Sequence, residues 1–205
     1  MIAAMLPVRK HFRTLILLAI IIPSGIVACA TTDRLPGNIH LVDASPDTGF
    51  RIYRSARPNA NIMQTYCELG LEEIMVIAGN AHDYEFKLQQ YCPSLKVIFN
   101  QKQTSKIPLS ESFLQYFDRW VMDAKKEGKI IAFRCDSGAH RTGRLAAYYQ
   151  MKYNRLSAED AKIIMTAHGR WMFKYPHLYP QVDALNDYIH NRPCSVPLKH
   201  CVKDE

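Results

Sequence analysis

Residues 134–144, Arg-Cys-Asp-Ser-Gly-Ala-His-Arg-Thr-Gly-Arg, constrain the fold of this chain more than any other stretch. The segment before them, 129–133, is mostly apolar and contains β-branched residues, which predicts a short buried strand. The segment after them, 145–151, is rich in good helix formers. We therefore predict a strand, a tight loop and a helix in direct succession, with the loop at the carboxyl end of the strand.

The predicted loop is suited to hold an anion. Successive backbone N–H groups that curl into a helix N-terminus form a cup for a negative charge, and the helix dipole adds positive character. Gly138 allows the turn because it carries no Cβ atom. A cysteine at the base of the cup, here Cys135, is expected to have a lowered pKa and to exist as a thiolate. Arg141 can hold two phosphate oxygens through its planar guanidinium group.

These residue types are the ones that phosphoryl transfer to a cysteine requires. The Cys135 thiolate would attack phosphorus, and water would hydrolyse the resulting phosphocysteine. The loop amides and Arg141 would supply most of the acceleration through positioning and charge stabilisation. Thr142 is placed to donate its hydroxyl to the Cys135 sulfur, which would make that sulfur a better leaving group in the second step.

The motif resembles the signature loop of the protein-tyrosine-phosphatase superfamily, including its bacterial dual-specificity-type members and its cysteine phytases. The match comprises Cys135, Gly138, Arg141, Thr142 and Gly143. Five fixed positions at average residue usage match by chance on the order of once per million start points or less. The resemblance spans about 38–191 and includes Tyr53-Arg-Ser-Ala-Arg-Pro58, which looks like the entry segment of small bacterial members. It implies that phosphate is bound by Asp136, Ser137, Gly138, Ala139, His140 and Arg141.

Two positions depart from the pattern of that family. Its members usually carry a histidine before the cysteine, whereas this chain has Arg134, which cannot accept a hydrogen bond. They also protonate the leaving group with an Asp from the loop before the preceding helix, but loop 100–110 contains no Asp. In the phytase-like branch that Asp lies four residues before a proline, a place that Thr104 holds here. Glu111 and Asp136 are the candidate substitutes as general acid, and the sequence does not choose between them.

The rest of the chain alternates between predicted strands and helices. We predict strands at 38–44, 50–55, 72–77, 95–100 and 129–134, and helices at 59–70, 81–91, 111–126, 141–153, 157–168 and 178–191. Ser157 is the expected N-cap of its helix. This alternation indicates an α/β fold with a central, mostly parallel sheet flanked by helices on both faces. The first two strands are expected to form a hairpin at one edge of the sheet.

The N-terminal segment has the pattern of an export signal. Residues 1–13 are basic and lack acids, and residues 14–28 are almost wholly apolar but too few for a spanning helix. Ile26-Val-Ala-Cys29 resembles a bacterial lipobox, in which Cys29 would be lipidated; ordinary signal cleavage after Ala30 and a permanent anchor are the alternatives. We favour the lipobox and an outer-membrane lipoprotein facing the periplasm or the exterior, otherwise a periplasmic or secreted protein. The predicted organisation is a signal peptide (1–29), a linker (30–37), a phosphatase domain (38–192) and a tail (193–205).

Four of the six cysteines remain once Cys29 and Cys135 are set aside. An even number in an exported protein favours disulfides. Cys194 and Cys201 bracket the tail and are expected to close it, whereas the pairing of Cys67 with Cys92 stays open. The spacing of Cys and His fits no zinc site, so we expect no metal and no other cofactor.

The charge of the chain favours anionic ligands. The formal net charge is +7, and four cations lie in two loops expected to flank the cup: Lys102, Lys106, Arg170 and Lys174. Together with export, this favours a phosphatase for inositol polyphosphates, as in the cysteine phytases. A protein tyrosine or dual-specificity phosphatase is the close alternative, and a phosphate-binding pseudophosphatase is the third. The expected partners are a phosphorylated small molecule or phosphoprotein and, through the lipid, a membrane, but no nucleic acid.

Overall fold

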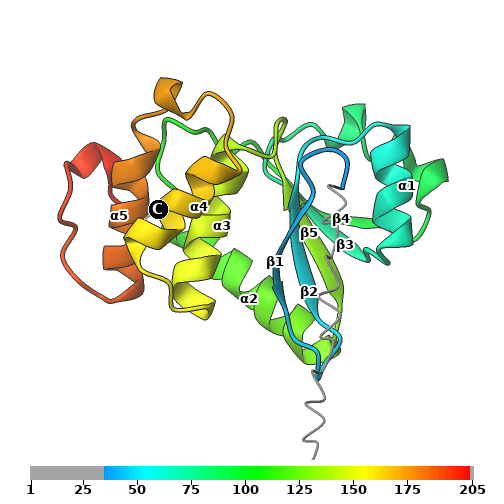
Figure 1. Ribbon diagram of the computed structural model, residues 1–205, viewed down its shortest axis with the longest axis horizontal. Helices are drawn as coiled ribbons and strands as arrows, with labels where there is room; N and C mark the ends of the chain where they lie inside the picture. The colour runs from blue at the N-terminus through cyan, green and yellow to red at the C-terminus, as the bar shows by residue number, and fades with distance from the viewer. Residues whose placement is uncertain (1–34, 204–205) are drawn as a thin grey trace, which may run out of the picture. The chain divides into compact units, whose positions relative to one another are not determined.

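The computed structural model describes residues 35–203, and a five-stranded sheet lies at their centre (Figure 1). The strands are β1 (His40–Ala44), β2 (Arg51–Ser55), β3 (Glu73–Val76), β4 (Lys96–Asn100) and β5 (Ile130–Arg134). Their order across the sheet is β1-β2-β5-β3-β4, with β1 antiparallel to β2 and the other neighbours parallel. The predicted mostly parallel sheet with an edge hairpin is therefore confirmed.

Helices cover both faces of the sheet. They are α1 (Ala60–Glu68), α2 (Glu111–Glu127), α3 (His140–Tyr153), α4 (Ala158–Ala167) and α5 (Leu178–Ile189). Helix α1 lies on one face and α2 to α5 gather on the other (Figure 1). Three of the helices begin at a side chain that caps a backbone N–H: Asn59 for α1, Ser110 for α2 and the predicted Ser157 for α4.

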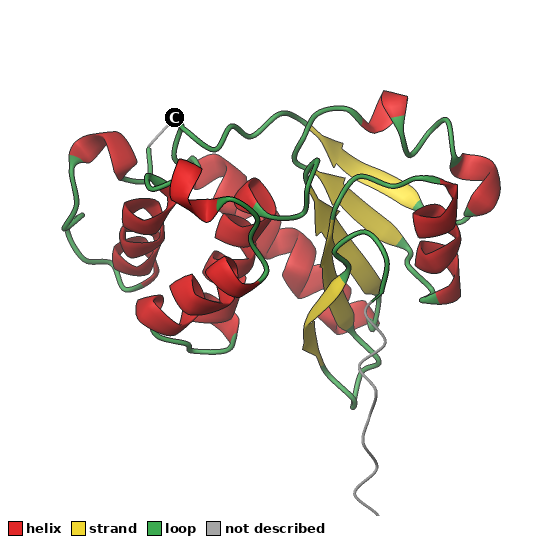
Figure 2. Cartoon of the chain, turned by 45° about the horizontal axis from the view of Figure 1, so that its top comes forward, coloured by secondary structure: helices red, strands yellow, loops and turns green. Residues whose placement is uncertain are grey.

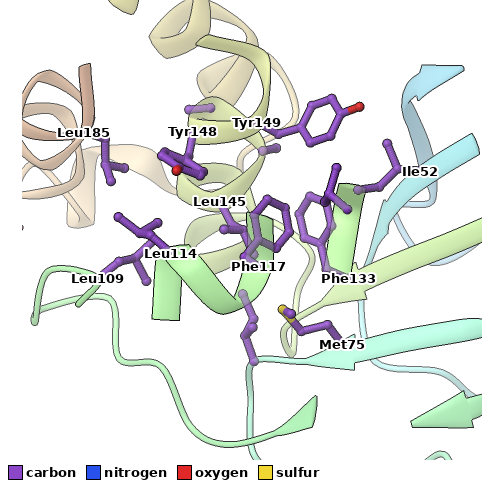
Figure 3. Packing of buried hydrophobic residues seen from close by; sticks show 14 of the residues in the cluster. Ile52, Met75, Leu109, Leu114, Phe117, Phe133, Leu145, Tyr148, Tyr149 and Leu185 are labelled. Carbon is purple, nitrogen blue, oxygen red and sulfur yellow. The ribbon is translucent and has the colours of Figure 1, made fainter. Parts of the chain in front are cut away.

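The alternation of side chains along β5 divides the core into two parts. Ile131 and Phe133 point to the face covered by α2 and α3, whereas Ala132 belongs to the cluster under α1. Phe133 meets Phe117 of α2 edge to face, with ring centroids 5.8 Å apart, and Tyr148 of α3 packs against the same ring (Figure 3). Strand β5 is thus buried on both sides, which fixes the position of the loop that follows it.

The predicted helix at 81–91 is wrong. The segment instead forms two short 3-10 turns, Ala81–Asp83 and Gln89–Tyr91. Asn80 does not cap a helix, because its amide binds other side chains, and Glu85 turns inward to a buried ion pair. Tertiary contacts of these two side chains therefore outweigh the local preference for a helix.

Disulfides join Cys67 to Cys92 and Cys194 to Cys201. The second closes the tail, as predicted, and the tail returns to α2, where the carbonyl of Lys203 accepts the N–H of Glu111 at 2.9 Å. No helix among residues 35–203 is both long enough and apolar enough to cross a membrane. The predicted export signal and Cys29 lie outside the described residues.

Candidate active site

The motif loop lies where the parallel strands end. The arrowheads of these strands meet at one edge of the sheet, next to the loops that lead to the helices (Figure 2). Strand β5 ends at Arg134 and α3 begins at His140, so residues 135–139 form the predicted turn. This edge is the usual ligand site of open α/β sheets.

The carbonyl groups of the loop are held away from its centre. Donors from outside the loop bind three of them in succession: Asp136 O accepts from Arg57 N at 3.1 Å, Ser137 O from Asn38 Nδ2 at 3.2 Å and Gly138 O from Arg54 Nη2 at 2.7 Å. Within residues 35–203, the N–H groups at positions 136–138 donate to no backbone carbonyl. Because the C=O of one residue and the N–H of the next point in opposite directions across a trans peptide, the contacts of the Asp136 and Ser137 carbonyls direct the amides of Ser137 and Gly138 toward the centre, where they form an anion nest.

The side chain of Arg54 in β2 holds the loop in place through hydrogen bonds to its carbonyl groups. Its side chain is 2 % exposed and also reaches Ala139 O at 3.4 Å, and no carboxylate in the described part of the chain pairs with it. Burial lowers the pKa of Arg54 to about 10, while the nearby Cys135 acts in the opposite direction. The buried guanidinium therefore both turns loop carbonyls outward and places a positive charge near the nucleophile.

Gly138 is the position at which the loop touches this support. Its φ is +67°, and a Cβ atom there would approach the amide nitrogen of Ala56 to 2.7 Å and the carbonyl carbon of Ser55 to 2.7 Å. Both neighbours are backbone atoms and cannot move aside like the end of a side chain. The loop thus needs glycine for its conformation and for its close approach to the segment that the sequence also singled out.

We expect Gly138→Ala to lower kcat/KM on an aryl phosphate by about 100-fold or more, because the loop must shift away from Ser55 and Ala56. The matched control is Gly49→Ala in the β1–β2 turn. Gly49 also has a positive φ, +83°, but a Cβ there meets only one atom, at 3.7 Å. Steady-state kinetics and thermal unfolding of both variants test this. Equal losses of activity in the two variants would contradict it.

Cys135 is 1 % exposed and lies at the base of the nest. Burial alone would raise the pKa of its thiol, but hydrogen bonds from the Thr142 hydroxyl and backbone, the charge of Arg141 and the amide of Ser137 outweigh it. The pKa of Cys135 is therefore below its usual value, which favours the thiolate. Among residues 35–203, no other group takes the hydrogen of the buried Thr142 hydroxyl, so this hydroxyl can rotate and face the Cys135 sulfur.

Replacing Thr142 by the isosteric Val is expected to raise the pKa of Cys135. The lowered pKa keeps the thiolate present at pH values below the ordinary thiol pKa, and loss of the hydroxyl removes part of that effect. The pH profile of Cys135 alkylation should therefore move to higher pH. Thr65→Val in α1, which also removes a helical hydroxyl, is the control and should leave the profile unchanged. An unshifted Thr142→Val profile would show that this hydroxyl does not act on the sulfur.

Arg141 is paired with a carboxylate of the loop itself. Its Nη2 lies 2.5 Å from Asp136 Oδ2, and Asn80 Nδ2 donates to the other oxygen at 2.8 Å. Burial opposes ionisation of Asp136, but the hydrogen bonds of Asn80 and Arg141 and the charge of Arg141 hold its pKa below the usual value. Asp136 therefore carries no proton near neutral pH, which disfavours it as the general acid.

Arg134, the residue before Cys135, forms a buried ion pair. Its guanidinium binds both carboxylate oxygens of Glu85, and the two side chains are 0 % and 2 % exposed. Its Nη1 also donates to Asn80 Oδ1 at 2.6 Å. Asn80 thus connects Arg134 to Asp136, and through it to Arg141. Arg134 therefore holds Glu85 and Asn80 beside the loop, and its charge also helps to lower the pKa of Asp136.

A cavity of about 370 Å³ opens above Cys135. It is lined by Lys102, Thr104, Ser105, Lys106, Cys135, Asp136, Ser137, His140, Arg141 and Tyr175. The predicted rim of four cations is therefore reduced to Lys102 and Lys106. Arg170 contributes its backbone carbonyl to His140, and the Lys174 ammonium lies over the Trp171 ring, 4.7 Å from its centroid.

The loop that should carry the general acid is fixed by Arg144. This side chain is 1 % exposed and donates to the carbonyls of Thr104 at 3.0 Å and Ile107 at 2.8 Å, and to Gln181. Burial and the charge of Arg141 lower the pKa of Arg144 to about 9. Glu111 does not line the cavity, and its carboxylate accepts a hydrogen bond from Gln115 at 3.0 Å. Asp136 is therefore the one carboxyl group among the described residues that line the cavity.

Four residues of the site were not predicted from the sequence: Asn38, Arg54, Asn80 and Arg144. Arg54 lies in the Tyr-Arg-Ser segment already noted, and that motif was a usable signal. Asn38, Asn80 and Arg144 carry no such signal, because the contacts that place them in the site join residues 37 or more positions apart along the chain, for example 99 for Asn38 with Ser137 and 56 for Asn80 with Asp136.

Comparison with known proteins supports the fold. No family model matches the chain, and no curated protein matches it. The crystal structure of P. aeruginosa TpbA is 21 % identical, with a TM-score of 0.54, and the match covers 77 % of this chain and 99 % of that one. The core catalytic domain of the PP-IP phosphatase SIW14 from S. cerevisiae is 17 % identical, with a TM-score of 0.56, and the match covers 74 % of this chain and 87 % of that one. PTPMT1 in complex with PI(5)P is 12 % identical, with a TM-score of 0.54, and the match covers 75 % of this chain and 97 % of that one. The chain thus has the fold of protein tyrosine and dual-specificity phosphatases.

Proposed function

We propose that the protein is a cysteine-dependent phosphomonoester hydrolase with Cys135 as the nucleophile. The observation that carries this is the placement of a thiol with a lowered pKa beneath a nest in which the carbonyls of Asp136, Ser137 and Gly138 are turned away from the centre. Arg141 lies beside the nest and lines the same cavity. Backbone amides and an arginine of this kind bind the oxygens of a phosphoryl group and stabilise their negative charge in the transition state of its transfer.

The reaction would proceed in two steps. The substrate phosphate binds the loop amides, and Arg141 exchanges its contact with Asp136 for two phosphate oxygens. The Cys135 sulfur attacks phosphorus, the bond to the leaving oxygen breaks, and the leaving group departs with the electron pair. Water then attacks the phosphocysteine, releasing phosphate and the thiolate, which Thr142 stabilises.

Trapping of the intermediate tests this mechanism and separates an enzyme from a phosphate-binding pseudophosphatase. Rapid acid quenching during turnover of a labelled aryl phosphate should give a covalent label on Cys135, located by peptide mass spectrometry. A pseudophosphatase would bind phosphate without labelling or turnover. Absence of the label in single-turnover experiments, with phosphate binding intact, would overturn the proposal.

We further propose a polyanionic small-molecule substrate of the inositol polyphosphate class. Lys102 and Lys106 line the cavity, and each phosphate outside the nest needs a cationic partner. Two structural neighbours support this class, since SIW14 is a PP-IP phosphatase and PTPMT1 was crystallised in complex with PI(5)P. A phosphotyrosyl protein is the second candidate, because a TpbA variant was crystallised with pTyr.

Replacing both Lys102 and Lys106 by Ala is expected to raise KM for inositol hexakisphosphate by about 10-fold. Each exposed pair is worth about 0–1 kcal/mol, so two together support a change of this size. KM for a small aryl phosphate should stay within about twofold. The charge-matched control is Arg170→Ala with Lys174→Ala, which removes two cations that do not line the cavity. Equal effects of the two double variants would favour general steering, and a preference of the parent for phosphotyrosyl peptides would favour the second candidate.

Export and lipidation at Cys29 stay a proposal that rests on the N-terminal sequence alone. An intact-mass measurement of the mature protein tests it. A mass that corresponds to a diacylglyceryl-modified Cys29 supports a lipoprotein, and a free N-terminus at Thr31 supports ordinary secretion.

A further inference from the structure

Two large aromatic side chains are exposed on the segment between α4 and α5. Trp171 is 62 % exposed and Phe173 is 73 % exposed, with ring centroids 6.0 Å apart. Exposed cations flank them: Lys174 lies over both rings, at 4.7 and 5.8 Å, and Arg170 precedes them. Residues 168–177 contain no Asp or Glu. The tip of the segment therefore combines two exposed apolar side chains with two positive charges.

The other side of this segment is fixed to the active site. Met172 points inward and is 6 % exposed, so that the aromatic residues on either side of it point away from the core. His140, the first residue of α3, contacts Arg170 O through Nε2 at 2.6 Å and stacks on Tyr175, with ring centroids 3.6 Å apart. Both His140 and Tyr175 line the Cys135 cavity. The exposed tip is thus joined to a wall of the catalytic cavity.

We propose that Arg170, Trp171, Phe173 and Lys174 form a contact site for an anionic lipid bilayer. Trp and Phe side chains favour the boundary between headgroups and acyl chains, and nearby Arg and Lys are attracted to anionic lipids. The site would hold the protein with the wall formed by His140 and Tyr175 close to the lipid surface. The contact involves no residue of the catalytic machinery, so it stands apart from the proposed hydrolase mechanism.

The size and charge of the site favour a bilayer over a protein partner or a second copy of this chain. Two aromatic side chains bury at most about 500 Å² in total, whereas stable protein interfaces bury about 1,200–2,000 Å². A second copy of this chain would also bring its own Arg170 and Lys174 against the same charges. A bilayer needs only a small inserted apolar area when anionic headgroups surround it. The distribution of groups at the tip meets that requirement.

Trp171 offers a local probe for this contact. The chain has two tryptophans, and Trp120 is 8 % exposed with its indole donating to Glu73 Oε2 at 2.7 Å. Changes in emission on adding vesicles therefore report on Trp171. This readout distinguishes the tip from any membrane attachment of the N-terminal segment, since that segment contains no tryptophan.

The experiment titrates the full chain with phosphatidylglycerol vesicles and with phosphatidylcholine vesicles. We expect a blue shift of emission and quenching by brominated acyl chains with the anionic vesicles, and a much weaker response with the zwitterionic ones. Phe173→Ser should weaken the anionic response about tenfold, and Arg170→Ser with Lys174→Ser should also remove most of its salt dependence. Met122→Ser, which removes an apolar side chain of similar exposure, 62 %, on α2, is the matched control.

The outcomes separate the possible occupants. All variants should keep the parental rate on an aryl phosphate, because none of these side chains lines the cavity. Emission that does not change when anionic vesicles are present would overturn the proposal. A blue shift that depends on protein concentration without vesicles would also overturn it, and would assign the tip to self-association.

Discussion

Cys135→Ser is expected to lose hydrolysis of an aryl phosphate by on the order of 10⁴-fold or more in kcat. A serine hydroxyl is far less acidic than a thiol, and the groups that lower the pKa of Cys135 cannot ionise it near neutral pH. The nest itself should persist, because its carbonyls are held by Arg54, Arg57 and Asn38 and not by the sulfur. Binding of a phosphate-bearing ligand, measured by calorimetry, should therefore change by less than about tenfold.

Arg141→Lys provides the contrasting variant. A point charge cannot replace the planar fork that holds two oxygens, so this variant should lose ligand affinity as well as rate. The two variants thus separate the chemical step from binding. Cys135→Ser is expected to change kcat alone, and Arg141→Lys both kcat and the dissociation constant of the ligand. Turnover of Cys135→Ser within about tenfold of the parent would exclude a covalent mechanism at this residue.

The sequence predicted the centre of the site but not its surroundings. The spacing of Cys135 and Arg141 depends on one strand, one loop and one helix, and local patterns predict such units well. The outward turn of the loop carbonyls depends on Asn38 and Arg54, which lie 99 and 84 residues from their partners. No local pattern can predict contacts of that kind, although the Tyr-Arg-Ser segment indicated that β2 matters.

The four cations predicted to form the rim also show that local sequence patterns do not predict long-range contacts. Lys102, Lys106, Arg170 and Lys174 all lie in polar loops that the fold was expected to place beside the cup. The structure brings the first two to the cavity and turns Lys174 onto Trp171 and Phe173. The helix predicted at 81–91 failed for a related reason, since the buried pair of Glu85 with Arg134 sets the path of that segment. Charge and periodicity in a sequence do not indicate which neighbour a side chain will meet.

Within residues 35–203, no carboxyl group is placed to act as the general acid, and this predicts the second large effect, a steep dependence of rate on the leaving group. Asp136 is held ionised, Glu111 is outside the cavity, and Arg144 fixes the loop at 104–107 by its carbonyls. A general acid is typically worth about 10²–10⁴-fold. Phenols, with pKa values of about 10, should therefore leave far faster than alkanols, which are much weaker acids. Among inositol polyphosphates, a diphosphate-bearing one should be cleaved faster than a simple monoester, because its leaving group is already a stable phosphate anion.

Thr104→Asp tests this directly, because Thr104 lines the cavity and holds the place of the family acid. Its backbone carbonyl, which Arg144 binds, is unaffected by the change, and an Asp carboxylate can still accept the N–H of Ile107 that the threonine hydroxyl now accepts at 3.1 Å. We expect kcat on an alkyl phosphate to rise by about 10- to 100-fold, with a new loss of rate at high pH as the added acid ionises. Thr104→Asn, of the same shape but without a proton to give, should show neither change. Rates on a nitrophenyl phosphate should stay within about threefold in both variants, because that leaving group needs no proton. If the parent already cleaves alkyl and aryl phosphates at similar rates, the site contains a proton donor after all, and Thr104→Asp should then add nothing.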